Sequence, residues 1–76
     1  MKVTVVYFAS LRERMGTAGC EASFEQGDTV ADLWQRLVDD AGSDRVLCAV
    51  NQRHSSYHER LGDGDEVAFF PPVTGG

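Results

Sequence analysis

The chain ends on a segment in which the side chains become small and then disappear. It runs Phe70-Pro71-Pro72-Val73-Thr74-Gly75-Gly76. Each proline holds its own φ at about −65° and pushes the preceding residue into an extended conformation. Because the two glycines have no Cβ, the walls of a partner protein can approach the terminal backbone closely. We therefore expect an extended arm, residues 71–76, that presents the carboxylate of Gly76 to a partner.

The carboxylate of Gly76 is the candidate reactive group of this sequence. A carboxylate is a poor electrophile, because its charge repels nucleophiles and an oxide is a bad leaving group, so it must first be activated. The competing interpretation is a frayed tail, since chain ends are usually disordered unless they are held. The two prolines, which aim the arm, favour a functional end.

No other set of residues has a spacing typical of a catalytic site. The sequence shows no serine paired with a histidine and an acid, and no phosphate-binding glycine loop. Asp39 and Asp40 are neighbours, which point apart on a helix and are expected to be solvated. His54 and His58 have a spacing that could bind a metal on a helix. Their segment lacks a helical pattern and a third ligand, so no metal site is predicted.

The composition is that of one small domain with an acidic surface. The chain has 76 residues and a net charge of −5, with no apolar run long enough to span a membrane and no secretory signal. We expect a cytoplasmic protein that binds neither membranes nor nucleic acid, since an acidic surface repels phosphate backbones. A partner with a basic docking face would suit this charge. Cys48 is expected in the core, and Cys20 is expected to be an inert thiol.

Five stretches have the composition and alternation of strands. They are residues 2–9, 20–25, 45–50, 53–54 and 66–70. Both faces of the first are largely apolar, with Val6 and Phe8 on the side opposite Val5, which predicts a central strand of a mixed sheet. In the last strand, Phe69 and Phe70 face opposite ways.

Two helices are predicted between these strands. A short one begins at Ser10, which is expected to form a capping box with Glu13, and ends at Gly16. The main helix begins with a second capping box, Thr29 to Asp32, and is expected to end at Gly42. We expect its apolar face to close the core, with the tryptophan as the main anchor rather than a ligand platform. This face consists of Val30, Leu33, Trp34, Leu37, Val38 and Ala41.

The order of these elements is strand, short helix, strand, long helix, strand, short strand, strand. It fits an α+β fold of the β-grasp (ubiquitin-like) type, with one main helix on a mixed sheet of four to five strands and a short second helix. In that fold the first and last long strands lie side by side and parallel at the centre of the sheet. We therefore predict a β-grasp domain, residues 1–70, followed by the arm, residues 71–76.

The octapeptide at residues 69–76 and the segment before it, residues 61–68, resemble a known family. They are similar to the end of the molybdopterin synthase small subunit, a ubiquitin-like sulfur carrier. The opening segment at residues 7–13 and the pair Asn51-Gln52 after an apolar strand are similar as well. The resemblance runs from end to end of the chain.

This resemblance implies a role for Gly76. A ubiquitin-activating-like partner would adenylate its carboxylate with ATP, and a sulfur donor would convert it to a thiocarboxylate. The arm would then insert into the large subunit of molybdopterin synthase, within a heterotetramer, and give its sulfur to the pterin precursor. The chain itself would bind no cofactor and supply no catalytic side chain. The residues expected to take part in insertion are Phe70, Pro71, Pro72, Val73, Thr74 and Gly75.

An exposed apolar patch around Phe69 and Phe70 is expected to help dock the domain, since buried aromatic residues often anchor interfaces. Other interpretations stay open. One is a different sulfur carrier of the same fold, such as that of thiamine biosynthesis, against which the Pro71-Pro72 pair argues. Another is a protein modifier linked to lysines through Gly76, and a third is an interaction domain with an inert tail.

Overall fold

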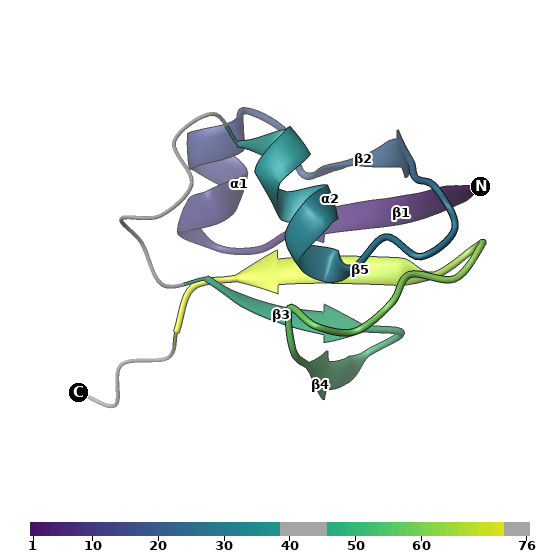
Figure 1. Cartoon of the computed structure of the whole chain (residues 1–76). Helices are drawn as coiled ribbons and strands as arrows, with labels where there is room; N and C mark the ends of the chain where they lie inside the picture. Colours follow the sequence, from purple (N-terminus) through teal and green to yellow (C-terminus); the bar gives the residue numbers. More distant parts are fainter. Residues whose placement is uncertain (39–45, 73–76) are drawn as a thin grey trace.

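The sheet at the centre of the fold is mixed and has five strands. The computed structural model describes residues 1–38 and 46–72 of the chain. The strands lie in the order β2-β1-β5-β3-β4 (Figure 1). This arrangement has the predicted mixed sheet with one longer and one shorter helix. The elements are β1 (Lys2–Tyr7), α1 (Ser10–Met15), β2 (Gly19–Ser23), α2 (Val30–Leu37), β3 (Leu47–Val50), β4 (Arg53–Ser55) and β5 (Glu66–Phe70).

The first and last long strands lie side by side and parallel, as predicted. The register pairs Val5 with Val67 and Tyr7 with Phe69. On their outer sides, β2 runs antiparallel to β1 and β3 runs antiparallel to β5. Because β1 and β5 are parallel, both end at the same edge of the sheet. At that edge β1 leads into α1 and β5 leads toward the C-terminus (Figure 1).

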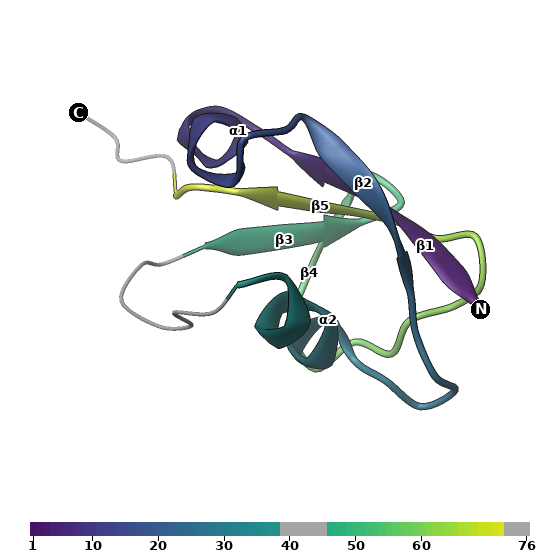
Figure 2. The same cartoon turned by 90° about the horizontal axis from the view of Figure 1, so that it is seen from above.

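α2 covers one face of this sheet, and the core lies between the helix and the sheet (Figure 2). Side chains alternate along a strand, so every second residue of β1, β3 and β5 points at α2. Trp34 packs against this core from its margin, with its ring centroid 4.5 Å from that of Phe69. The prediction that Cys48 belongs to the core is confirmed. Trp34 is only partly buried, so its predicted role as the main anchor is wrong, and the largest fully buried side chains are Tyr7 and Phe69. The most buried members are Val3, Val5, Tyr7, Val30, Leu33, Cys48, Val67 and Phe69.

The two helices begin in different ways. The N-cap of α1 is Ala9, with φ 53°, and no side chain caps it. The predicted capping box of Ser10 with Glu13 is therefore wrong, because Ser10 already lies in the first turn, where its hydroxyl cannot take the N-cap position. In α2 the predicted box is present. Thr29 Oγ1 accepts from the Asp32 N–H at 3.3 Å, and Asp32 Oδ2 accepts from the Thr29 N–H at 2.9 Å.

α1 ends where the sequence predicts, and α2 ends earlier than predicted. α1 ends at Gly16, whose left-handed conformation at φ 74° suits a residue without a Cβ. α2 ends at Leu37, earlier than predicted, and Val38 is extended with φ −124° and ψ 135°. Asp39-Asp40 would place two negative charges at the negative end of the helix dipole, which disfavours a longer helix. Residues 41–42, which hold the last predicted core position and the predicted stop, lie outside the described residues.

Several strands differ by one or two residues from their predicted bounds. β1 ends at Tyr7, and β4 continues to Ser55. β2 begins at Gly19 and ends at Ser23, before the predicted end at residue 25. Gly19 approaches β1 so closely that a Cβ on it would lie 2.3 Å from the carbonyl oxygen of Val5. The absence of a side chain at this position is therefore what allows the strands to pair there.

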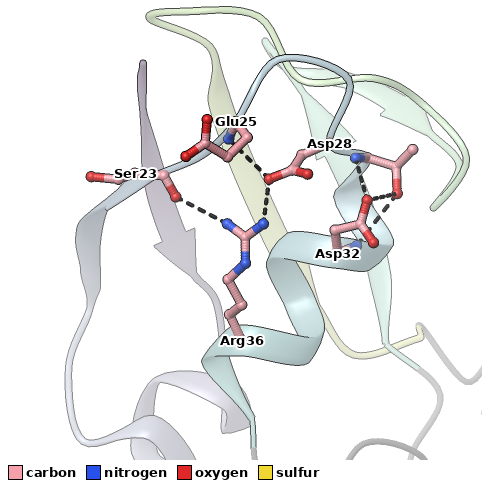
Figure 3. Close-up of polar contacts among 6 residues, drawn as sticks. Ser23, Glu25, Asp28, Asp32 and Arg36 are labelled. Atoms are coloured by element: carbon pink, nitrogen blue, oxygen red, sulfur yellow. Dashed lines mark hydrogen bonds and ion pairs between the residues drawn. The ribbon is translucent and has the colours of Figure 1, made fainter.

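A polar cluster ties α2 to the segment that follows β2 (Figure 3). Arg36 of α2 donates to the carbonyl of Ser23 at 3.2 Å and forms an ion pair with Asp28. Asp28 Oδ2 also accepts from the backbone N–H of Glu25 at 3.0 Å. The carboxylate of Asp28 thus bridges the loop before α2 and the second turn of that helix.

We expect Asp28 to make folding stability depend on pH in the acidic range. The N–H of Glu25 and the guanidinium of Arg36 lower the pKa of Asp28 below that of a free aspartate, about 3.9. A lowered pKa in the folded state contributes stability above the unfolded pKa, and this stability is lost as the pH falls through the folded pKa. Asp28→Asn should therefore destabilise the protein at neutral pH, and its urea midpoint should converge with that of the wild type at strongly acidic pH.

The control for this prediction is the same substitution in an Arg36→Gln background. Without the guanidinium, Asp28→Asn should change the free energy of unfolding less at neutral pH, because part of the cause of the pKa shift has been removed. A destabilisation that stays the same from neutral to strongly acidic pH would contradict the prediction.

Candidate functional site

β5 carries the predicted arm and is held on both sides up to its end. Phe70 pairs with Leu47 of β3. On the other side, the N–H of Phe8 donates to the carbonyl of Phe69 at 3.1 Å. The pair Pro71-Pro72 follows, half-buried, and neither proline has an N–H with which to continue the ladder. The chain therefore leaves the sheet from its central strand. The point of exit is fixed because β5 is hydrogen-bonded to β3 on one side and to the segment that follows β1 on the other.

Three of the predicted site residues, Phe70, Pro71 and Pro72, lie in the described part of the chain. The other predicted residues lie outside it, so their roles stay predictions from the sequence. The division into a domain of residues 1–70 and an arm of residues 71–76 likewise stays a prediction. The residues outside the described part are Val73, Thr74, Gly75 and Gly76.

Asn51, in the turn between β3 and β4, holds the start of β5. Asn51 and Gln52 have φ of 51° and 69°, as a two-residue type I′ hairpin requires, which confirms the predicted turn. The Asn51 N–H donates to the Glu66 carbonyl at 2.8 Å, and Asn51 Oδ1 accepts from the Glu66 N–H at 3.0 Å. Asn51 Nδ2 donates to Asp65 Oδ1 at 2.9 Å. These bonds fix the register of β5, and hence the start of the arm, against β3.

The turn before β5 binds that strand to β1 as well. The carbonyl of Asp65 accepts from the Thr4 N–H at 2.9 Å, and Asp63 Oδ1 accepts from the Lys2 N–H at 2.9 Å. Within the turn, Asp65 Oδ2 accepts from the Gly62 N–H at 2.8 Å. The sequence identified this turn but not its links to β1 and β3, because those partners are brought together only when the strands pair.

The face of the sheet that points away from α2, which we call the open face, carries apolar side chains around the start of the arm. The strand register places Val6, Ala68 and Ala49 side by side on this face. Phe8 is 44% exposed and Leu47 is 40% exposed, so this surface is accessible in the described part of the chain. We define the apolar patch as Val6 and Phe8 near the end of β1, Leu47 and Ala49 of β3, and Ala68 and Phe70 of β5. Ala68, at 8% exposure, is buried among the others, and Val6, Ala49 and Phe70 are half-buried.

Phe69 does not belong to this patch, and its predicted exposure beside Phe70 is wrong. It is 0% exposed, because it points at α2. Its ring centroid lies 6.4 Å from that of Tyr7, 4.5 Å from that of Trp34 and 6.4 Å from that of Tyr57. Phe70, one residue further along, points to the open face and is half-buried. Only the second phenylalanine can therefore contact a partner.

Val6 of β1 and Phe8, which directly follows β1, are two members of the patch that the sequence did not predict. The apolar alternation of Val6 and Phe8 indicated a central strand, and β1 is indeed paired on both sides. The pattern did not reveal that α2 covers only the opposite face. The same alternation, together with Leu47 in β3, is the signal from which an exposed apolar face could have been predicted.

The titratable groups of the core favour protonated, unreactive forms. Burial raises the pKa of Tyr7 to about 12 and that of Tyr57 to about 12. Burial also raises the pKa of the Cys48 thiol. Cys20 is exposed on β2, with its sulfur 4.0 Å from the Tyr7 hydroxyl. Residues 1–38 and 46–72 contain no group of three or more histidine, cysteine or acidic side chains that could hold a metal ion.

No helix in the described part of the chain is long and apolar enough to cross a membrane. The described residues define a class of protein: a β-grasp (ubiquitin-like) domain in which the parallel strands β1 and β5 lie at the centre of a mixed sheet.

Comparisons with known proteins agree with this class. The model of the ThiS family matches residues 5–76. The chain is 41% identical to the molybdopterin synthase sulfur carrier subunit of Escherichia coli (strain K12), over 97% of this chain and 99% of that protein. The structure of the putative molybdopterin converting factor, subunit 1, from Pyrococcus furiosus superimposes with a TM-score of 0.82 at 36% identity, covering 96% of this chain and 99% of that one.

A second structure, of SAMP1 from Haloferax volcanii, has a TM-score of 0.84 at 27% identity and covers 100% of both chains. The protein therefore belongs to the ThiS family, among the molybdopterin synthase sulfur carrier subunits, and the predicted β-grasp fold is confirmed.

Proposed function

We propose that this chain carries sulfur on Gly76 and donates it to the pterin precursor as the small subunit of molybdopterin synthase. The observation that supports this most directly is the course of β5. It is held on both sides up to Phe70 and leads into the arm, in a chain whose relatives are molybdopterin synthase sulfur carrier subunits.

Two steps would load the sulfur. On an adenylating partner of the ubiquitin-activating kind, the Gly76 carboxylate attacks the α-phosphorus of ATP, which forms an acyl adenylate and releases pyrophosphate. A sulfur nucleophile, in its simplest form hydrosulfide, then attacks the acyl carbon. AMP leaves with the electrons of the C–O bond and a proton is lost, which leaves a thiocarboxylate. ATP is bound by the partner, so this chain needs no cofactor of its own.

The thiocarboxylate is a good nucleophile at neutral pH, and the arm delivers it to the large subunit. This division of labour agrees with the raised pKa values of Tyr7, Cys48 and Tyr57, none of which favours a nucleophile or base in this domain. In this proposal the large subunit supplies the catalytic side chains, and the small subunit supplies the sulfur and the arm, within a heterotetramer.

The apolar patch is the surface that we assign to docking on the large subunit. Ala68 and Phe70 of the patch lie on the strand that leads into the arm, and Phe8 lies where β1 ends at the same edge. A protein that takes in the arm must therefore approach this edge of the sheet. Burying large apolar and aromatic side chains is a common source of interface energy. A basic rim on the partner would complement the net charge of −5.

Docking of the domain would also offset the entropy lost by the arm. Ordering residues 71–76 costs about 1–2 kcal/mol each, roughly 6–12 kcal/mol together. Each proline reduces this cost by about 0.4–1 kcal/mol, because it narrows the ensemble of the free arm. The remainder must come from contacts of the arm itself and of the apolar patch.

The proposal predicts that part of the protein isolated from its own host carries a C-terminal thiocarboxylate. Intact-mass analysis should show a species heavier by one oxygen-to-sulfur exchange, which disappears on hydrolysis. The same species should form when the protein is incubated with its adenylating enzyme, ATP and a sulfur source. If this incubation yields an adenylate but never a thiocarboxylate, the carrier function is wrong.

A second candidate function is conjugation to other proteins through Gly76. It is favoured by the likeness to structures from Haloferax volcanii, one of which is named small archaeal modifier protein 1. The two functions share the adenylate and differ in what attacks it. Lysine-linked conjugates in host lysates, abolished by deletion of Gly76, would establish the second function. A thiocarboxylate without such conjugates would support the first alone.

A further inference from the structure

His54 lies beside the apolar patch on the open face. It stands on β4 opposite Ala49 of β3, and residues paired in this way share a face of the sheet. Its ring centroid is 5.6 Å from that of Phe70, and the two ring planes meet at 83°. The side chain of His54 is exposed. An ionisable ring therefore borders the surface from which the arm begins.

The elements next to His54 present apolar groups to it on this face. β3 carries no charged residue, and the one charged residue of β5, Glu66, lies at the end of that strand away from the arm. On β4, Arg53 and Ser55 pair with the neighbours of Ala49 and so point to the opposite face; Ser55 donates to Glu59 there. Among residues 1–38 and 46–72, no ion pair involves His54.

We propose that the charge of His54 regulates docking on the open face: the neutral ring allows the large subunit to close on the apolar patch, and a proton on the ring weakens the complex. This inference rests on the proposed function, in which the patch is the docking surface. In the free protein, a charged imidazole at this exposed position stays hydrated. In the complex it would lose that water beside Phe70 without a carboxylate from β3 or β5, and burying an unpaired charge is unfavourable.

Histidine is the side chain whose ordinary titration falls between about pH 5 and 8. The dependence of docking on pH is therefore the property that tests a role for the His54 ring. His58, the other histidine, lies in the loop after β4, has no ring contact with the patch, and offers a matched control.

Equilibrium binding to the molybdopterin synthase large subunit of the same organism, measured between about pH 7.5 and 5.5, tests this inference. We expect the Kd of the wild type to rise roughly tenfold over this range, because only the protein with a neutral His54 ring would bind well. His54→Leu should bind almost equally at both ends of the range. His54→Asn, which is polar but does not titrate, should show the same flat profile, and His58→Leu should retain the dependence of the wild type.

The comparison of variants decides between the outcomes. If His54→Leu and His54→Asn lose affinity toward the acidic end as strongly as the wild type does, another group is responsible. The inference is then overturned while the proposed function stands. A wild-type affinity that is flat, or that increases toward acidic pH, overturns it too. If the wild type fails to bind the large subunit at about pH 7.5, the proposed function fails with it. Circular dichroism at both ends of the range shows whether each variant is folded.

Discussion

Gly76→Val is expected to lower sulfur transfer by about 100-fold or more while the domain stays folded. A β-branched side chain adds bulk where the walls of the partner must close on the backbone, and it restricts φ. The reacting group must approach the carbonyl carbon to within about 3–3.5 Å, and a displacement of about 1 Å can lower the rate by about 100-fold. Gly75→Val should act in the same way. Product formation with the large subunit measures the effect.

Two further variants sharpen this test. One residue added after Gly76 should be as damaging as valine, because the reactive carboxylate would overshoot its position. Gly76→Ala, with a smaller addition, should retain more activity than Gly76→Val. ATP–pyrophosphate exchange shows whether adenylation or the later transfer is lost, and circular dichroism verifies the fold. Near-normal transfer by a folded Gly76→Val or by the extended chain would mean that the terminus is not the reactive group.

Phe69→Ala and Phe70→Ala are expected to separate stability from docking, although the two residues are neighbours. Phe69 is completely buried against Tyr7, Trp34 and Tyr57. Replacing it by alanine should cost about 3–5 kcal/mol of folding free energy, as removal of a buried aromatic ring usually does. Phe70 lies on the open face and is half-buried. Phe70→Ala should therefore destabilise the fold much less and weaken docking on the large subunit instead.

Urea melts and binding measurements on both variants check this pair. If Phe70 is an anchor of the interface, its truncation should cost about 2 kcal/mol or more of binding free energy, which is about a 30-fold increase in Kd. Phe8→Ala, at the residue that directly follows the neighbouring strand β1, should resemble Phe70→Ala. Equal losses of stability for Phe69→Ala and Phe70→Ala would contradict the assignment of the two faces. Unchanged binding by Phe8→Ala and Phe70→Ala would exclude the patch as the docking surface.

The sequence by itself determined the elements and the class of fold. The alternation in β1 and β5, the apolar face of α2, the box from Thr29 to Asp32 and the turn at Asn51 express preferences of residues that are close neighbours in the chain. The predicted arm also rests on local properties, namely the restricted φ angles of Pro71-Pro72 and the absence of side chains at Gly75 and Gly76. For this reason the sequence alone predicts Gly76 as the reactive end, and this stays a prediction.

Only the tertiary structure decided which surfaces those elements present. Alternation states that Phe69 and Phe70 face opposite ways, but the side on which α2 lies determines which one is buried. Likewise, the links of Asn51 to Asp65 and of His54 to Phe70 join residues far apart in the chain. They exist because β3 pairs with β5 and β4 pairs with β3. Pairing between distant segments depends on the whole core closing at once, and no short stretch of sequence encodes it.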